Sequence, residues 1–239
     1  MMHFVGDWSL STFSTFGNAP PLLPDPAVVK IWLSVGWGVV LAAAGWTLAS
    51  VGFKVAPLSL ARYAKGCSAL FAALLALWCW LPGANGASFW LGLAFQSPSL
   101  TSVVCCCAIL WANVGALREI GHETGSLSGH QSWRIAGVLG GAALGWILLL
   151  DTLGFWPVSV YRWGFHPVAG PLALLAVGLL WAVTGARFTW AQCWMVLAAA
   201  AMFILLRLPT GNLWDALLDP LLWVALNALS VRWVWYKVR

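Results

Sequence analysis

DALLDPLLWVALNAL, residues 215–229, places a proline directly behind an acidic residue and in front of a long apolar run. Proline suits the first position of a helix, because its missing N–H would have no partner there. An Asp or Ser before it can accept hydrogen bonds from the exposed amides of the first turn, whereas a histidine is a poorer cap. Three other apolar runs begin in the same way, at Asp25-Pro26, Ser97-Pro98 and His166-Pro167. The pattern therefore predicts four helix starts, at residues 26, 98, 167 and 220.

The composition indicates a membrane protein. Hydrophobic residues make up 62% of the 239 residues and charged residues only 8%, whereas a soluble domain has about 25% charged residues. So few charges cannot cover a surface that faces water. Apolar stretches of about 20 residues, the length that crosses the hydrocarbon layer, recur along the whole chain. The sequence therefore predicts an all-α, polytopic integral membrane helical bundle.

We expect about seven transmembrane helices, at residues 26–53, 66–81, 98–117, 135–150, 167–186, 188–206 and 220–236. The last span can instead begin at Leu213, which would place Asp215 and Asp219 in its first turns. A single transmembrane domain over residues 26–239 follows, because no insert between the spans is long enough to fold alone. Residues 1–25 then form an extracytoplasmic N-terminal tail, and we expect no cleavable signal peptide because a basic segment before an apolar core is missing.

The basic residues predict the orientation of the spans. With the N-terminus outside, nine Lys and Arg residues fall on the inner side and three on the outer side, which is a positive-inside bias. The inner set is Lys54, Arg62, Lys65, Arg118, Arg134, Arg187, Arg232, Lys237 and Arg239, and the outer set is Lys30, Arg162 and Arg207. The prediction is N-out and C-in. The short loops are typical of a bacterial cytoplasmic (inner) membrane protein, and many of the 19 tryptophans fall near predicted span ends, as in an interfacial belt.

Two predicted outer connections carry most of the polar candidates for a site. They hold Asp151, Tyr161, Arg162, His166, Arg207, Asp215 and Asp219. One interpretation is a polar vestibule where the outer helix ends meet. The other is a set of interface charges that neutralise one another, and such surface ion pairs usually contribute little. The residues alone leave both interpretations open.

The first outer connection contains ASFWLGLAF, residues 87–95, which is too short to span a bilayer. Residues 87–96 can form an interfacial helix or a re-entrant one. Phe89 and Trp90 are typical headgroup-level anchors, which favours the interfacial form. The segment before it, LPGAN at residues 81–85, resembles LPTGN at residues 208–212. An internal hairpin duplication explains this likeness, and so does the shared chemistry of turns at an interface.

The sequence offers no cofactor or metal site. Asp215 and Asp219 would share one face of a continuous helix, but neither has histidines or further carboxylates at metal-ligand spacing. A retinal Schiff base would need a lysine within the last span, where Asn227 lies instead. Haem b would need paired histidines within spans, and all four histidines fall in loops or at span ends. The inner-loop pair His122 and His130 matches no strong metal motif.

A glycine pattern predicts close helix packing. Gly137, Gly141 and Gly145 recur at four-residue spacing, so one face of their helix allows another helix to approach closely. The approaching helix can belong to a neighbouring span, to a membrane-protein partner or to a second copy of the chain. The bilayer itself is the expected environment. The net charge of +5 does not indicate affinity for nucleic acid, because in a membrane protein the side on which the basic residues lie matters more than their total.

Three functions remain open. A non-catalytic membrane subunit, scaffold or assembly factor fits the scarcity of ionisable residues within spans, which proton-coupled carriers usually contain. A small-solute channel or permease fits the short-looped spans. A membrane enzyme with an outward-facing site would act on a lipid-linked or anionic substrate, although no catalytic motif is present. The first alternative is favoured.

Overall fold

The structure is a computed structural model, and it describes residues 23–54, 63–118, 131–155, 157, 159–184 and 190–238. Over these residues the protein is all-helical, with 81% of residues in helices and no strand. The long helices are α2 (Pro26–Lys54), α4 (Ala64–Trp78), α6 (Leu100–Arg118), α7 (Gln131–Thr152), α9 (Ala169–Thr184), α10 (Trp190–Leu206) and α12 (Pro220–Val238). The short helices are η1 (Gly83–Asn85), α5 (Ala87–Phe95), α8 (Val160–Trp163) and α11 (Leu213–Leu217).

Each of the seven predicted spans coincides with one of the long helices, so the prediction of an all-α fold is confirmed. Among the described residues, one helix is long and apolar enough by itself to cross a membrane, α2 over Pro26–Gly52. The apolar stretches of the other described helices are shorter, for example Leu100–Val114 and Gly137–Thr152. The crossing of a bilayer by all seven helices therefore stays a prediction.

Two of the four predicted helix starts are confirmed. Helix α2 begins at Pro26 and α12 at Pro220, each directly behind an aspartate. The Asp25 carboxylate accepts a hydrogen bond from the Ala27 N–H at 2.7 Å, and the Asp219 carboxylate accepts one from the Leu222 N–H, also at 2.7 Å. These are the contacts expected of aspartate at an N-cap.

The other two starts are wrong by two residues. Helix α6 begins at Leu100 because Ser99, rather than Ser97, caps it: the Ser99 Oγ accepts from the Ser102 N–H at 3.1 Å. Helix α9 begins at Ala169. Before it, the His166 Nδ1 accepts from the Val168 N–H at 3.2 Å, which makes a turn of His166-Pro167 instead of a first helical turn.

The alternative start of the last span at Leu213 is also wrong. Residues Leu213–Leu217 form the separate helix α11, and Leu218 leaves it in an extended conformation with φ −142° and ψ 125°. Asp215 therefore lies in α11, whereas Asp219 lies in front of α12. The two carboxylates do not share the face of one continuous helix, because the backbone turns between them.

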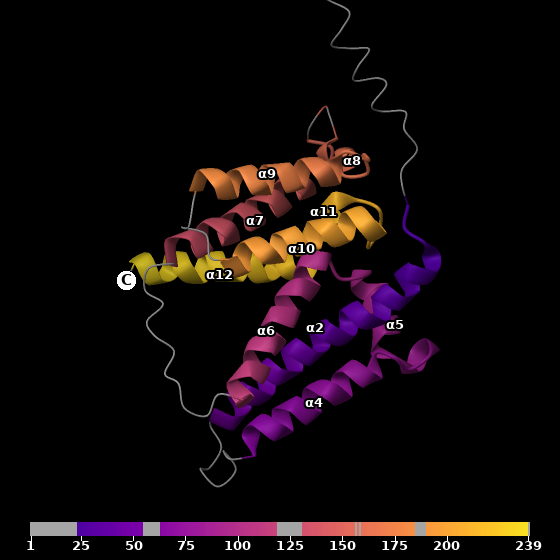
Figure 1. The fold of residues 1–239 in the computed structure, drawn as a ribbon, viewed down its shortest axis with the longest axis vertical. Helices are drawn as coiled ribbons and strands as arrows, with labels where there is room; N and C mark the ends of the chain where they lie inside the picture. The colour runs from indigo at the N-terminus through magenta and orange to yellow at the C-terminus, as the bar shows by residue number, and fades with distance from the viewer. Residues whose placement is uncertain are drawn as a thin grey trace, which may run out of the picture.

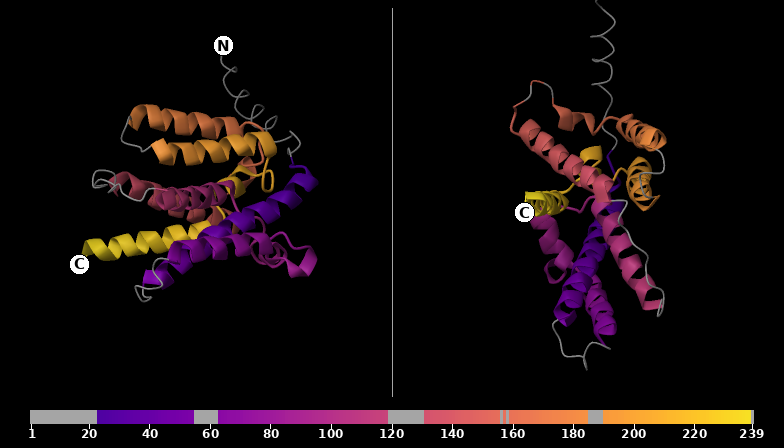
Figure 2. Two further views of the ribbon diagram at one scale, coloured as in Figure 1. Left: turned by 60° about the horizontal axis from the view of Figure 1, so that its bottom comes forward. Right: turned by 90° about the vertical axis from the view of Figure 1, so that its left-hand side faces the viewer.

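The main contacts among the long helices form two sets, one that links α2, α4, α6, α10 and α9 and one between α7 and α12. Helix α2 packs along α4 and α6, α7 packs against α12, and α10 packs against both α9 and α6. Figures 1 and 2 show α5, α8 and α11 at the end of the bundle away from the C-terminus, which we call the short-helix end. The links that carry the predicted polar candidates meet there.

A hydrophobic core at the short-helix end joins the N-terminal and C-terminal parts of the chain. Its buried members come from α2, α6, α10 and α11 and from the link between the last two, and they are Trp32, Leu100, Val103, Ala199, Phe203, Leu208, Leu213 and Ala216. Gly36 allows the close approach of α2 to the start of α6, since a Cβ there would lie 2.7 Å from the Pro98 Cγ. The Trp32 indole N–H donates to the Pro98 carbonyl at 3.1 Å within this core.

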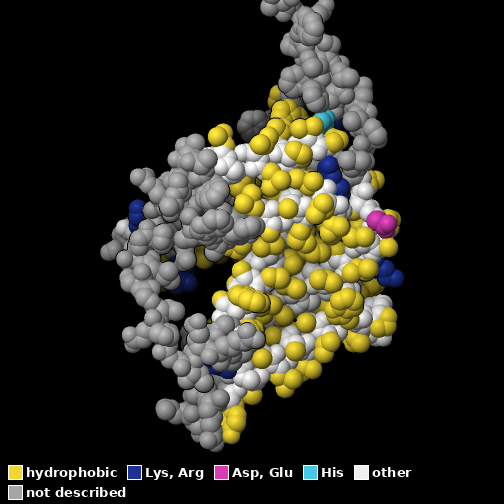
Figure 3. Space-filling view, viewed as in Figure 1, with side chains coloured by type: hydrophobic (Ala, Val, Ile, Leu, Met, Phe, Trp, Pro, Cys, Tyr) yellow, Lys and Arg dark blue, Asp and Glu magenta, His cyan; other side chains and the backbone are white. Residues whose placement is uncertain are grey.

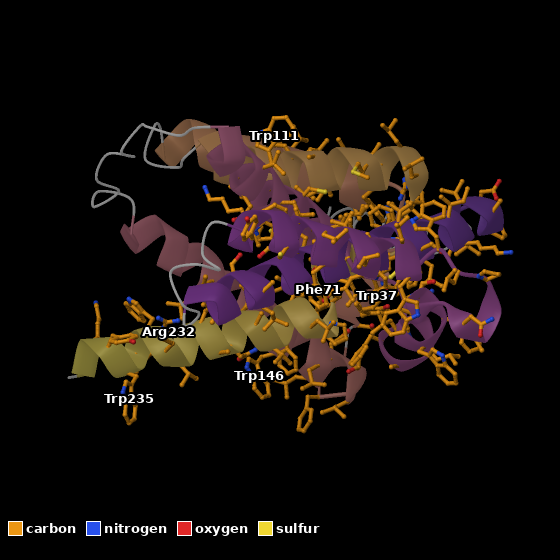
Figure 4. All side chains as sticks on the ribbon, turned by 90° about the horizontal axis from the view of Figure 1, so that it is seen from below. Trp37, Phe71, Trp111, Trp146, Arg232 and Trp235 are labelled. Carbon is orange, nitrogen blue, oxygen red and sulfur yellow. The ribbon has the colours of Figure 1, made fainter. Side chains whose placement is uncertain are left out.

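The outer surface of the bundle is strongly apolar. Large hydrophobic side chains are exposed along all seven long helices, and Trp111 and Leu205 reach 80% exposure. Figure 3 shows one face on which hydrophobic side chains are almost continuous and charged ones lie near the edges. Figure 4 shows Trp235 pointing away from the bundle and Trp146 beside α12, where its ring packs against Trp223 and its indole N–H donates to the Asn227 Oδ1. Trp37 contacts Phe95 of α5 from α2. Exposed apolar side chains gathered on one face are typical of surfaces that contact protein or lipid.

Candidate functional site

The predicted polar candidates lie mainly on two links at the short-helix end. The α7–α9 link, residues 153–168, contains α8, and the α10–α12 link, residues 207–219, contains α11. Asp151 lies at the end of α7, just before the first link. Hydrogen bonds between the two links bring Tyr161 and Asp215 together, while Asp151 and Asp219 bind elsewhere.

Asp151 fastens α8 to the end of α7. Its carboxylate accepts from the Tyr161 N–H at 2.7 Å, from the Val160 N–H at 3.0 Å and from the Ser159 Oγ at 3.1 Å. The Tyr161 backbone N–H is the main reason that the pKa of the Asp151 carboxyl lies below its ordinary value. This carboxylate therefore acts as an anchor for the first turn of α8.

Tyr161 and Asp215 join the two links. The Tyr161 hydroxyl donates to the Asp215 carboxylate, whose oxygens lie 2.9 and 2.8 Å away, and the Thr210 hydroxyl donates to the same group. Burial, followed by the hydrogen bond to Asp215, raises the pKa of Tyr161 above its ordinary value. The phenol thus stays protonated and continues to donate, so the pair acts as a latch between α8 and α11.

Asn212 continues this connection, and the sequence interpretation did not include it. Its buried amide donates to the Tyr161 carbonyl at 3.0 Å and accepts from the Trp214 N–H at 2.9 Å, which caps α11. Gly164 lies against it, because a Cβ at Gly164 would overlap the Asn212 Oδ1. An asparagine directly before an apolar LWDAL segment was the signal available in the sequence, since Asn is a favoured N-cap.

Asp219 caps two helices at once. Its Oδ2 accepts from the Ser99 N–H at 2.9 Å and from the Ser102 hydroxyl, both at the start of α6, while its Oδ1 accepts from the Leu222 N–H in α12. A negative charge suits both sites, because the N-terminus of each helix carries partial positive charge. Ser99 and Ser102 were missed by the sequence interpretation, since they lie more than a hundred residues from Asp219 in the chain.

Arg207 has a different environment. It directly follows α10 with φ 55°, in the left-handed region that non-glycine residues rarely adopt. Its Nη2 donates to the Pro167 carbonyl at 3.2 Å, and its guanidinium lies 5.1 Å from the centre of the Phe203 ring. Its Nη1 is buried and has no hydrogen-bond partner in the structure. Burial lowers the pKa of Arg207 from its ordinary value, although an arginine remains charged.

The remaining candidates stand apart from the latch. Arg162 is exposed on α8, and His166 is half-buried in the turn before α9. Over the described residues, no ion pair joins Arg162 or Arg207 to Asp151, Asp215 or Asp219; these three carboxylates accept from N–H and O–H groups instead. The cluster is therefore built from hydrogen-bonded anchors rather than from charges that neutralise one another.

Two of the three glycines at four-residue spacing in α7 pack against α12, and the third does not. A Cβ at Gly141 would lie 2.7 Å from a Leu226 methyl group, and one at Gly145 would overlap the Trp223 ring, so both glycines lie against α12. The Trp223 indole N–H donates to the Ala142 carbonyl at 3.2 Å in the same contact. Gly137 has no neighbour within 4 Å of its Cβ position.

Helix α5 lies along α2 at the same end of the bundle. A Cβ at Gly92 would lie 3.1 Å from a Leu33 methyl group, and the Trp37 indole N–H donates to the Gln96 carbonyl at 2.9 Å. The opposite side of α5 exposes Trp90 and Leu93. The segment is thus a real nine-residue helix with one side packed on α2 and the other apolar and open.

The described residues contain no group of three or more His, Cys, Asp or Glu side chains arranged to hold a metal ion. His122 and His130 lie outside the described residues. Comparisons of the chain with protein-family models, with curated proteins and with solved structures find no match.

Proposed function

We propose that the protein is a non-catalytic integral membrane subunit or scaffold. The observation that carries the proposal is the use of the carboxylates at the short-helix end. Asp151 and Asp219 each accept hydrogen bonds from three donors of their own chain, and Asp215 accepts from two, the Tyr161 and Thr210 hydroxyls. A general base or a metal ligand needs an open lone pair directed at a substrate position. These carboxylates instead fasten helix ends together, which is a structural role.

The lengths of the helices support their insertion in a bilayer. The Trp32–Pro98 hydrogen bond places the start of α6 level with Trp32 of α2. From Trp32 to Gly52, α2 extends about 30 Å, and α6 extends about 28 Å, close to the thickness of the hydrocarbon layer. The two helices would then cross the layer from the same depth. Their exposed apolar side chains would face lipid acyl chains.

The position of α5 along the axis of α2 supports an interfacial location for this short helix. Its contacts on α2 are Leu33 and Trp37, which lie within about 8 Å of Trp32 along the helix axis. An interfacial helix buries its apolar side about 5–10 Å into the headgroup boundary. Helix α5 would therefore lie at the outer boundary of the bilayer, with Trp90 and Leu93 in lipid. In this topology α8 and α11 face the same outer side.

The insertion is tested separately from the role. Full-length protein expressed with a reporter after Arg239 should resist extraction by alkaline carbonate and should show the reporter on the cytoplasmic side. A reporter on the outer side contradicts the N-out, C-in topology. Extraction by carbonate contradicts the integral membrane assignment.

The role is tested by native mass spectrometry after gentle purification from the native membrane. We expect a stoichiometric complex with a membrane-protein partner. The latch variant Tyr161→Phe should lower the thermal stability of that complex, while Tyr236→Phe, which changes an exposed phenol, should not. A protein that purifies alone and conducts a solute across liposomes contradicts the subunit role and supports a permease.

A further inference from the structure

At the short-helix end, the guanidinium of Arg207 makes fewer hydrogen bonds than it has donors for. A guanidinium carries five N–H donors in a planar fork. At Arg207 one Nη2 contact is made, to the Pro167 carbonyl, and Nη1 is buried without a partner. A buried donor without an acceptor is rare in native structures and calls for an explanation.

Within the described part of the chain, no carboxylate forms an ion pair with Arg207. The three carboxylates of the short-helix end, Asp151, Asp215 and Asp219, are engaged with backbone and hydroxyl donors of their own chain. The remaining contact of the guanidinium is the Phe203 ring, which holds the cation at 5.1 Å but accepts no conventional hydrogen bond. An anion from outside the chain would complete this environment.

The surroundings indicate the kind of anion. Arg207 directly follows α10 and contacts the Pro167 carbonyl shortly before α9. Exposed apolar side chains occur near these helix ends: Val168 just before α9, Leu172 in its first turn, and Leu205 and Leu206 at the end of α10. Helices α9 and α10 pack against each other along their lengths. A cation at the polar edge of an apolar helix pair matches a ligand with a phosphate head and hydrocarbon chains.

We propose that Arg207 anchors a binding site for an anionic phosphate group, supplied by the headgroup of an acidic phospholipid. Arginine binds phosphate through two parallel N–H···O bonds. The site requires a rotation of the guanidinium about its last side-chain torsions, which would bring the covered Nη1 to the surface and give it the acceptor that it lacks. The phospholipid form of the site rests on the membrane insertion proposed above, whereas binding of free phosphate does not.

The test uses full-length protein in a neutral detergent and measures the shift in melting temperature on adding each probe. The probes are phosphatidylglycerol, phosphatidylcholine and inorganic phosphate. We expect phosphatidylglycerol to stabilise the protein and phosphatidylcholine not to do so. Arg207→Gln should weaken the apparent affinity for phosphatidylglycerol about tenfold or more, the loss expected for one charge-assisted bidentate contact. The apparent affinity of Arg207→Lys, which keeps the charge but not the planar fork of donors, should lie between those of the wild type and Arg207→Gln.

Arg162→Gln is the matched control, because Arg162 is an exposed arginine on α8 at the same end of the bundle. It should leave the shift unchanged. Stabilisation by inorganic phosphate but not by phosphatidylglycerol, if it depends on Arg207, supports the anion site and rejects the lipid as its source. Equal loss in Arg162→Gln, or a phosphatidylglycerol shift that survives in Arg207→Gln, overturns the proposal. If Arg207→Gln does not fold, the Arg207→Lys comparison decides. Carbonate extraction of the same variants separates a failed anion site from failed insertion.

Discussion

The Tyr161 hydroxyl donates to the Asp215 carboxylate, whose two oxygens lie 2.9 and 2.8 Å away, across 54 residues of chain. This contact joins α8 to α11, two helices of four and five residues that are too short to be stable alone. The Asn212 side-chain amide donates to the Tyr161 carbonyl, and the Gly164 carbonyl accepts from the Leu213 N–H, which completes the junction. The short-helix end is therefore held by tertiary contacts between links rather than by the stability of its own helices.

Tyr161→Phe removes the phenolic donor and leaves the ring in place. We expect the free energy of unfolding to fall by about 1–2 kcal/mol, because a partly buried hydrogen bond to a carboxylate is lost. Denaturation by SDS in mixed micelles measures it. Asp215→Asn should cost a similar amount, and the double variant should cost less than the sum of both. Strict additivity of the two changes would contradict a direct interaction.

Gly164→Ala places a methyl group against the Asn212 amide and the Trp214 ring. We expect a loss of about 1–3 kcal/mol in the free energy of unfolding, because the junction is overpacked. Gly178→Ala is the control, since a Cβ at Gly178 has no neighbour within 4 Å and α9 should gain up to about 1 kcal/mol in helix propensity. Equal effects of the two changes would show that α8 and α11 are not closely packed.

Asp219→Ala removes the shared cap of α6 and α12. We expect a loss of about 2–4 kcal/mol in the free energy of unfolding, because donors at two helix starts lose their acceptor in a buried place. Asp25→Ala removes an exposed single cap at the start of α2 and should cost about 1 kcal/mol or less. If the two variants are equally stable, the double cap does not exist.

The pH dependence of stability should include a contribution from Asp151. Its folded-state pKa is lowered, so its contribution is complete well above the unfolded pKa of about 3.9 and is lost as the pH falls through the folded value. The melting temperatures of wild type and Asp151→Asn, compared from pH 6 downward, should differ by a steady amount above about pH 5 and begin to converge below about pH 4, as the pH falls toward the folded pKa. A difference that stays constant across this range would exclude an ionised Asp151 as the anchor of α8.

The local patterns that predict single helices succeeded where the deciding residues are neighbours in sequence. Asp25-Pro26 and Asp219-Pro220 begin α2 and α12, because an aspartate and a proline suffice for an N-cap and a first turn. Ser97-Pro98 and His166-Pro167 were misplaced by two residues. At Ser97-Pro98 the Pro98 side chain packs against Gly36, and the cap falls to Ser99, which is bound to the distant Asp219.

The candidate site shows the same division between what local sequence patterns predict and what tertiary contacts decide. The sequence indicated that polar residues gather on the outer connections, because loop residues at one end of a bundle are brought near one another. It did not indicate the pairing of Tyr161 with Asp215 or the place of Asp219 between α6 and α12. Those partners depend on how α10 packs against α6 and α9, which no local pattern specifies.

By itself, the sequence determined the all-helical class and the positions of the seven long helices, because apolar runs of this length satisfy their backbone hydrogen bonds locally as helices. Only the tertiary structure decided which carboxylate anchors which helix end and left the Arg207 Nη1 without an acceptor. The physical reason is the different distance in sequence over which the two kinds of interaction act. Helix formation depends on residues within a few positions, whereas the satisfaction of a buried charge depends on side chains brought together from distant parts of the chain.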